Sequence, residues 1–330
     1  MVAEYLPWHQ PLWEALSGRA EQAHAYLLHG PAGSGKRALA ERFAAWLLCC
    51  QPQVEQACGN CSSCRLYQAE THPDLFYLQP EEPGKAILIG HVRDLVGSIQ
   101  QTAQQGGRKV IILEPAEVMT TESANALLKS LEEPGPGTVF LLLSDQPSFL
   151  LPTIKSRCVL QACPLPPADM ATQWLAEKLP ETCSEERDTL LQLASGSPLL
   201  ALEYARDGLL RQRAEVVEGV KQLLKRQSSA SELATRWAKL PAVLLLEWFA
   251  DWCQAALRYQ LTQNEEDLGL ADMQPVLKYL SGLASADALL QLHDWILERR
   301  VKLLRRAPLR QDLLLESMLG QWLALAQRKR

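Results

Sequence analysis

The chain has 330 residues, 47% of them hydrophobic, and a formal net charge of −5 at pH 7. This length predicts two or three domains with sizeable buried cores. The acidic balance argues against a protein that coats nucleic acid by itself, so any DNA contact would be local or shared with partners.

The N-terminus lacks a basic segment followed by an apolar run, so no signal peptide is expected and a cytoplasmic location is predicted. Charged residues interrupt the apolar stretches well before 18 residues, so no membrane span is expected. In this compartment, metal binding is a better interpretation of the nine cysteines than disulfides.

The first half of the chain alternates short apolar strands with helical patterns, which is typical of a parallel sheet covered by helices. Residues 26–29 are expected to form the strand before a glycine-rich loop. Residues 123–133 are expected to form a helix that ends at the breaker cluster 134–137. The other predicted strands are 75–78, 109–113 and 138–144, and the other predicted helices are 35–48 and 92–99.

Residues 30–37 read Gly-Pro-Ala-Gly-Ser-Gly-Lys-Arg and match the phosphate-binding pattern G-x-x-x-x-G-K-[ST] except at its last position. In that pattern, glycines let backbone N–H groups surround the phosphates, the lysine reaches the β and γ oxygens, and the hydroxyl binds Mg²⁺. Arg37 stands in place of the hydroxyl and cannot bind a metal cation. The candidate nucleotide-binding residues are Gly30, Gly33, Gly35 and Lys36.

Four cysteines have the spacing of a metal site, with eight, two and two residues between them: Cys49, Cys58, Cys61 and Cys64. Four thiolates satisfy tetrahedral Zn²⁺ with no open position, so the predicted role is structural. Cys50 competes with Cys49 for the fourth place, and spacing alone does not separate them. The alternatives are an iron–sulfur centre and free cysteines packed at the end of the preceding helix.

Glu114 and Pro115 follow the predicted strand 109–113. At this place P-loop NTPases carry an Asp for Mg²⁺, and many ATPases follow it with a Glu that orients the attacking water. Glu114 could still reach a metal, but Pro115 cannot polarise water. Together with Arg37, these residues predict a chain without ATPase activity of its own.

Arg157, in the triplet Ser-Arg-Cys, follows the last predicted strand. An arginine supplied in trans to a neighbouring nucleotide site stabilises transition-state charge and raises hydrolysis roughly 10³–10⁵-fold. A subunit without hydrolysis of its own could complete its neighbour's site in this way. Arg157 is therefore the candidate catalytic residue, acting in trans.

No further strands are expected beyond the proline-rich segment 163–167, so the fold class is α/β followed by all-α. Residues 166–207 fit a small three-helix domain, and residues 208–330 a helical bundle. Its long amphipathic helices are predicted at 209–226, 243–261, 288–306 and 313–327. Five of the nine Trp lie in this bundle, either in its core or on an oligomerisation surface.

Together these motifs resemble the clamp-loader branch of the AAA+ ATPases. The resemblance covers about residues 5–205, and over 208–330 it rests only on length and helical character. The stretches that carry it are His24–Gly30, the four-cysteine set, Thr71–Asp74, Ser123–Pro134, Ser156–Cys158 and Gly196–Pro198.

The resemblance implies three parts: a RecA-like AAA+ domain with the zinc module at 49–64 (residues 1–165), a helical lid (166–207) and a collar that holds a ring of subunits (208–330). In the bacterial DNA polymerase III complex that this branch includes, motor subunits (gamma or tau) hydrolyse ATP and delta pulls on a sliding clamp. The complex places the clamp on primed DNA.

On this comparison the chain is a comparatively rigid partner, with Arg157 as the arginine finger that reaches the ATP of an adjacent motor subunit. Motor subunits carry Lys-Thr or Lys-Ser in the loop, Asp-Glu at the strand end and an Arg in the second sensor motif. The corresponding residues here are Lys36-Arg37, Glu114-Pro115 and Leu199.

Two other functions stay open at the level of sequence. One is an active ATPase of clamp-loader type that uses Lys36 and Glu114. The other is a zinc-module protein that binds nucleic acid, which the scarcity of basic residues disfavours, since Arg65 is the only one from 49 to 70. Binding of ATP or ADP without hydrolysis also stays open.

Overall fold

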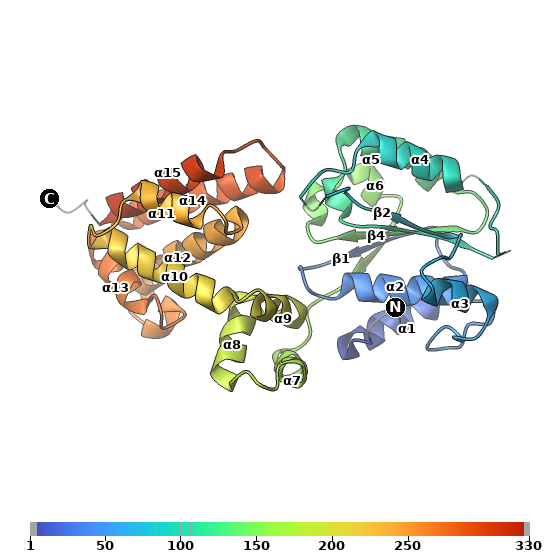
Figure 1. Cartoon of the computed structure of the whole chain (residues 1–330), viewed down its shortest axis with the longest axis horizontal. Coiled ribbons are helices and arrows are strands. Elements are labelled where there is room, and N and C mark those ends of the chain that lie inside the picture. The colour runs from blue at the N-terminus through green and yellow to red at the C-terminus, as the bar shows by residue number, and fades with distance from the viewer. Residues whose placement is uncertain (1–4, 83, 100, 106, 327–330) are drawn as a thin grey trace. The chain divides into compact units, whose positions relative to one another are not determined.

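The computed structural model describes residues 5–326 except 83, 100 and 106. The chain divides between Tyr204 and Ala205 into two compact units, whose elements are labelled in Figure 1. In the part of the chain that the structure describes, no helix is both long and apolar enough to cross a membrane. The ends of the predicted first and last domains, residues 1–4 and 327–330, lie outside the described residues.

The first unit contains a five-stranded sheet with the order β2-β3-β4-β1-β5, in which all pairs are parallel. The strand β1 lies between β4 and β5, so its Leu27 is opposite Leu142 on one side and Leu160 on the other. The strands are β1 (Ala25–His29), β2 (Leu75–Leu78), β3 (Lys109–Leu113), β4 (Thr138–Ser144) and β5 (Val159–Ala162). The α/β prediction for this half is confirmed.

The strand β5 was not predicted from the sequence. It has four residues, lies at the edge of the sheet and has no continuous buried run. Strands that are buried on both faces show long apolar runs, but a short edge strand has no such signal. Its apolar residues are Val159, Leu160 and the small Ala162, with Gln161 between them.

Helices cover both faces of the sheet (Figure 1). One face packs against α4 (Ile89–Ile99), α5 (Thr121–Glu132) and the short α6 (Pro152–Lys155). The other packs against α1 (Gln10–Ser17) and α2 (Lys36–Leu48). Successive strand residues point to opposite faces, so Ile111 and Phe140 face the first set and Ile112 and Leu141 the second.

The helix α5 starts two residues earlier than predicted. The side chain of Thr120 accepts a hydrogen bond from the Ser123 backbone N–H and so caps the helix N-terminus. Threonine is a good N-cap because its oxygen satisfies one of the free N–H groups of the first turn. The described part of this unit also contains α3 (Ser62–Gln68), α7 (Ala168–Lys178), α8 (Ser184–Leu193) and the beginning of α9 (Pro198–Arg206). The division of the chain into three domains stays a prediction.

The second unit is helical in its described part, as predicted. Its long helices are α10 (Leu209–Leu224), α12 (Ala242–Thr262), α14 (Ala286–Leu304) and α15 (Gln311–Leu325), and its shorter ones are α11 (Ala230–Trp237) and α13 (Gln274–Leu283). The core interpretation is confirmed for Trp237, Trp248, Trp252 and Trp322, which are buried. Trp295 is half-buried and lies under the Arg299 guanidinium.

An ion pair joins the buried Arg213 of this unit to the partly exposed Asp272. Arg213 donates from Nε and Nη2 to the two carboxylate oxygens of Asp272, at 2.7 and 3.1 Å. The guanidinium carbon also lies 5.3 and 5.4 Å from the ring centres of Trp248 and Trp252. The Arg213 side chain is 6% exposed and that of Asp272 is 35% exposed, so the cation is stabilised by one partly exposed carboxylate and two aromatic faces.

We expect Asp272→Ala to lower the free energy of unfolding by about 2 kcal/mol, because it removes the carboxylate partner of the buried Arg213 guanidinium. The partial exposure of Asp272 keeps the loss below that of a fully buried pair. Urea denaturation followed by circular dichroism measures the change. Glu265→Ala is the control, since its ion pair with Lys278 is exposed and its loss should leave the denaturation midpoint in place. Equal midpoints for the two variants would contradict a stabilising role for the pair of Arg213 and Asp272.

Candidate functional site

The loop of residues 30–37 is packed from two sides. At Gly33, in the left-handed region with φ 70°, an added Cβ would lie 2.2 Å from Ser197 Oγ and 2.8 Å from Leu200 N. At Gly35, with φ 90°, it would lie 2.4 Å from Leu6 Cδ1 and 2.6 Å from His9 Cε1. Both contacts are far too short for a side chain, so the two glycines are required by close packing as well as by φ.

Trp8 and His9, near the N-terminus, both contact the Ser34 carbonyl in the loop of residues 30–37. The oxygen of Ser34 accepts from Trp8 Nε1 at 2.9 Å and lies 2.9 Å from His9 Nε2. A carbonyl only accepts, so Nε2 of His9 carries the proton. Burial lowers the pKa of His9, which favours this neutral form.

Lys36 is directed into its own loop. Its side chain is 5% exposed, and its Nζ forms an ion pair of 2.6 Å with Asp145 Oδ1. It also donates to the carbonyls of Gly30 and Pro31 at 3.0 and 2.7 Å, with Ser34 Oγ at 3.3 Å. An ammonium group has three donors, so these partners already account for the group that would otherwise reach phosphate.

Arg37 lies between two carboxylates. Its Nε is 3.0 Å from Glu41 Oε1, and its Nη1 is 3.2 Å from Glu114 Oε2. Burial raises the pKa of Glu114, and the charge of Arg37 opposes that shift. The acid that would hold Mg²⁺ is thus paired with a cation of the chain itself.

The four predicted cysteines come together. Their Sγ atoms all lie within 4.8 Å of one another. Tetrahedral zinc with Zn–S bonds of about 2.3 Å places sulfurs about 3.8 Å apart, so the cluster has the size for one ion after small movements. Cys50 is exposed and outside this group, so the geometry favours Cys49 as the fourth ligand.

Secondary structure positions these thiols. Cys49 follows the last residue of α2, and Cys61 is the N-cap of α3 (Ser62–Gln68), where its Sγ accepts from the Cys64 N–H at 3.3 Å. Burial raises the pKa of Cys61, but hydrogen bonds to its sulfur outweigh that effect and lower the pKa to about 6. A thiolate is the form that binds a metal.

Three side-chain donors hold consecutive carbonyls of the loop between Cys49 and Cys58. Trp46 donates to Gln53 at 2.8 Å, Trp13 to Val54 at 3.3 Å and Arg42 to Glu55 at 2.8 Å. The Arg42 guanidinium carbon lies 3.9 Å from the ring centre of Trp13. The sequence did not indicate this support, because tryptophan and arginine in helices are common without such a role.

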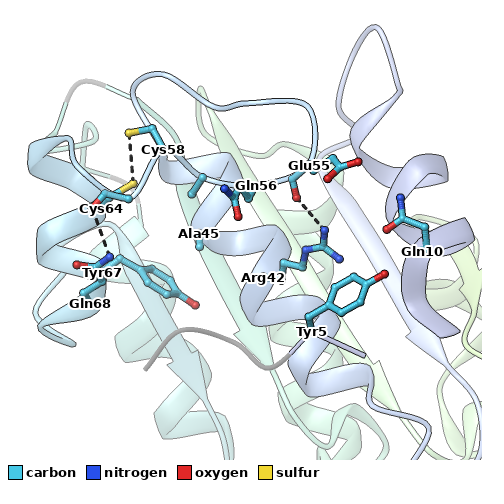
Figure 2. A pocket seen from close by; sticks show the side chains of 12 residues that line it. Tyr5, Gln10, Arg42, Ala45, Glu55, Gln56, Cys58, Cys64, Tyr67 and Gln68 are labelled. Atoms are coloured by element: carbon cyan, nitrogen blue, oxygen red, sulfur yellow. Dashed lines mark hydrogen bonds between the residues drawn. The ribbon is translucent and has the colours of Figure 1, made fainter. Parts of the chain in front are cut away.

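An open cleft of about 560 Å³ lies beside the thiols. Figure 2 shows Arg42 and Tyr5 at one end of it, and Cys58 and Cys64 at the other. Tyr67, whose hydroxyl donates to the Glu41 carbonyl at 2.8 Å, forms part of its wall. The thiol cluster therefore borders the cleft rather than lying in the sheet core.

Arg157 lies between α6 and β5, with a side chain 33% exposed. Its Nη2 is 2.5 Å from Glu132 Oε1 at the end of α5. Its Nη1 donates to the Thr153 carbonyl at 2.9 Å and lies 3.3 Å from Ser156 Oγ. These partners lie on the α5–α6 side, and no motif in the sequence singled out Glu132.

The structure therefore places the predicted residues in separate groups. The loop, Glu114 and Asp145 form one group, the four thiols a second, and Arg157 with Glu132 a third. Their roles toward nucleotide, metal and a neighbouring subunit stay predictions.

Comparison with known proteins identifies relatives along the chain. The family described as "DNA polymerase III, delta subunit" matches residues 10–166, and "DNA polymerase III, delta subunit, C terminal" matches residues 207–324. A Pseudomonas aeruginosa protein named DNA polymerase III subunit delta' is 56% identical over 98% of this chain and 99% of its own. A Yersinia pestis protein of the same name is 35% identical over 96% and 93%.

A solved structure of a DNA polymerase III gamma subunit-related protein from Thermotoga maritima also matches. It is 23% identical and covers 97% of this chain and 99% of its own, with a TM-score of 0.44.

Proposed function

The chain belongs to the family of DNA polymerase III delta-prime subunits, and on that premise we propose that it acts in a clamp loader without hydrolysing ATP. The main support is that two ion pairs occupy the loop of residues 30–37: Lys36 pairs with Asp145, and Arg37 pairs with Glu114. We call this arrangement the closed loop. Hydrolysis requires a lysine on phosphate and a carboxylate on Mg²⁺. Both groups are engaged with partners of the chain itself.

The alternative of an active ATPase would require both ion pairs to open. Glu114 would have to exchange the Arg37 guanidinium for a metal, with no hydroxyl at position 37 to complete the coordination. Pro115 would still leave the attacking water without a base. The geometry therefore disfavours intrinsic turnover.

Arg157 is proposed as the arginine finger for the ATP of an adjacent motor subunit, gamma or tau. Its guanidinium is partly exposed and bonded to Glu132, which is itself 49% exposed. An exposed ion pair contributes about 0–1 kcal/mol, so phosphate oxygens of a neighbour could replace Glu132 at small cost. Arg157 is therefore available to act in trans.

The second unit is proposed as the collar that joins this chain to gamma or tau and delta. Three exposed apolar residues, Leu290, Leu297 and Val301, lie seven and four positions apart on α14. This spacing places them on one face of the helix, and an exposed apolar stripe is typical of an interaction surface. Through the assembled complex, the chain would serve the sliding clamp and primed DNA in the bacterial cytoplasm.

The four thiols are proposed to hold one structural Zn²⁺. A closed set of four sulfurs leaves no position for water or substrate. The short distances among the four Sγ atoms support zinc. The ion would join the end of α2 to α3 and the loop between them.

We expect Arg157→Ala to lower ATP turnover roughly 10³-fold or more at the one motor site that Arg157 completes. A loader reconstituted with gamma or tau and delta would therefore lose the fraction of its DNA-stimulated ATPase activity that this one site contributes. Steady-state ATPase measures the loss, and size-exclusion chromatography checks that the complex still assembles. Lys155→Ala, which removes a cation two residues earlier at the end of α6, is the matched control. Unchanged ATPase and clamp loading in Arg157→Ala would refute the finger assignment.

Elemental analysis of the purified chain should find one zinc per molecule, and Cys61→Ser should lose it, because the ion would keep only three thiolates. Cys50→Ser is the matched control and should retain full zinc content, since Cys50 lies outside the cluster. Zinc loss in Cys50→Ser, or a metal-free wild type, would contradict the assignment.

A further inference from the structure

A buried serine and histidine lie next to the thiol cluster without belonging to it. Ser63 is in α3 between Cys61 and Cys64, and His72 is in the segment before β2. Their exposed fractions are 1% and 6%. Among the described residues, the group that could hold a metal contains the four cysteines and not His72.

The hydrogen bonds of Ser63 and His72 form a chain in which each donor and each acceptor can be assigned. The backbone N–H of Asp74 donates to His72 Nδ1 at 3.1 Å, so Nδ1 is unprotonated and Nε2 carries the proton. Nε2 lies 2.8 Å from Ser63 Oγ, and the Ser63 hydroxyl donates to the Leu48 carbonyl at 2.6 Å. Every donor in the chain of bonds has an acceptor, so one tautomer satisfies all of them.

These bonds join the two segments that supply the thiols. Leu48 is the last residue of α2 and immediately precedes Cys49. Ser63 immediately precedes Cys64. The Ser63 hydroxyl therefore links the backbone on one side of the cluster to the helix on the other.

The far end of this chain of bonds is fixed to the sheet. The Asp74 carboxylate accepts from the backbone N–H groups of Gln104 and Gln105, at 2.8 and 2.9 Å. The Asp74 carbonyl accepts from the Val110 N–H at the beginning of β3. His72 is therefore held by parts of the fold that do not depend on the thiols.

We propose that His72 and Ser63 are positioning residues of the zinc module, which hold Cys49 and Cys64 at the separation that the metal needs. The inference rests on the proposed zinc site and names the residues outside the ligand set that determine its affinity. Removing a group that hydrogen-bonds to a metal ligand typically changes metal affinity 10–100-fold, and Ser63 acts one step further out, on the backbone next to Cys49. This gives the motif Thr71–Asp74 a role that the nucleotide loop does not explain.

The test measures zinc on the full-length chain. The affinity is obtained by competition with a chromogenic chelator, and the release rate by transfer to an excess of that chelator. We expect His72→Ala to weaken zinc binding 10–100-fold and to speed its release. His72→Gln should restore most of the affinity, because its amide N–H can donate to Ser63 Oγ from nearly the place of Nε2.

His91→Ala is the matched control, because His91 pairs with the exposed Glu81 on another face, and its zinc affinity should equal that of the wild type. If His72→Ala fails to fold, Ser63→Ala removes only the hydroxyl and carries the same expectation. Unchanged zinc affinity in a folded His72→Ala or Ser63→Ala, even with a lower melting temperature, would overturn the proposal. A wild type that binds no zinc would instead overturn the zinc site itself.

Discussion

The proposed lack of ATP hydrolysis depends first on the ion pair between Arg37 and Glu114. The Arg37 guanidinium lies 3.2 Å from one carboxylate oxygen of Glu114, the acid that an active ATPase would place on Mg²⁺. Lys36 is withdrawn in the same way by Asp145 and by two carbonyls of the loop. The loop keeps the backbone of a phosphate site, because its glycines are required by the packing of residues 6–9 and 197–200 against it.

The helix α2 connects this closed loop to the thiol cluster. It begins at Lys36 and ends at Leu48, so one end carries the loop and the other precedes Cys49. Ser63 and His72 fix the second end to α3 and to the sheet. A rigid helix with both ends held is consistent with a subunit that serves as a support for moving neighbours. The chemistry proposed for the complex then depends on Arg157, which lies outside this rigid part.

Much of the sheet could be predicted from sequence, because strands such as 109–113 and 138–144 are continuous apolar runs. The edge strand β5 could not, since half-exposed edges lack that signal. Spacing predicted the thiol site, but the choice of Cys49 over Cys50 depends on where α2 ends. The residue type of Arg37 indicated a defective loop, while its pairing with Glu114 depends on the adjacency of α2 and β3, which sequence periodicity does not give.

We propose that the two ion pairs keep this loop from binding nucleotide as well as from hydrolysing it, and calorimetric titration of the purified full-length chain with MgATP measures that binding. We predict no saturable binding, because the groups that would hold phosphate and metal are already paired inside the chain. Saturable binding that requires Mg²⁺ and is lost in Lys36→Ala would contradict the account.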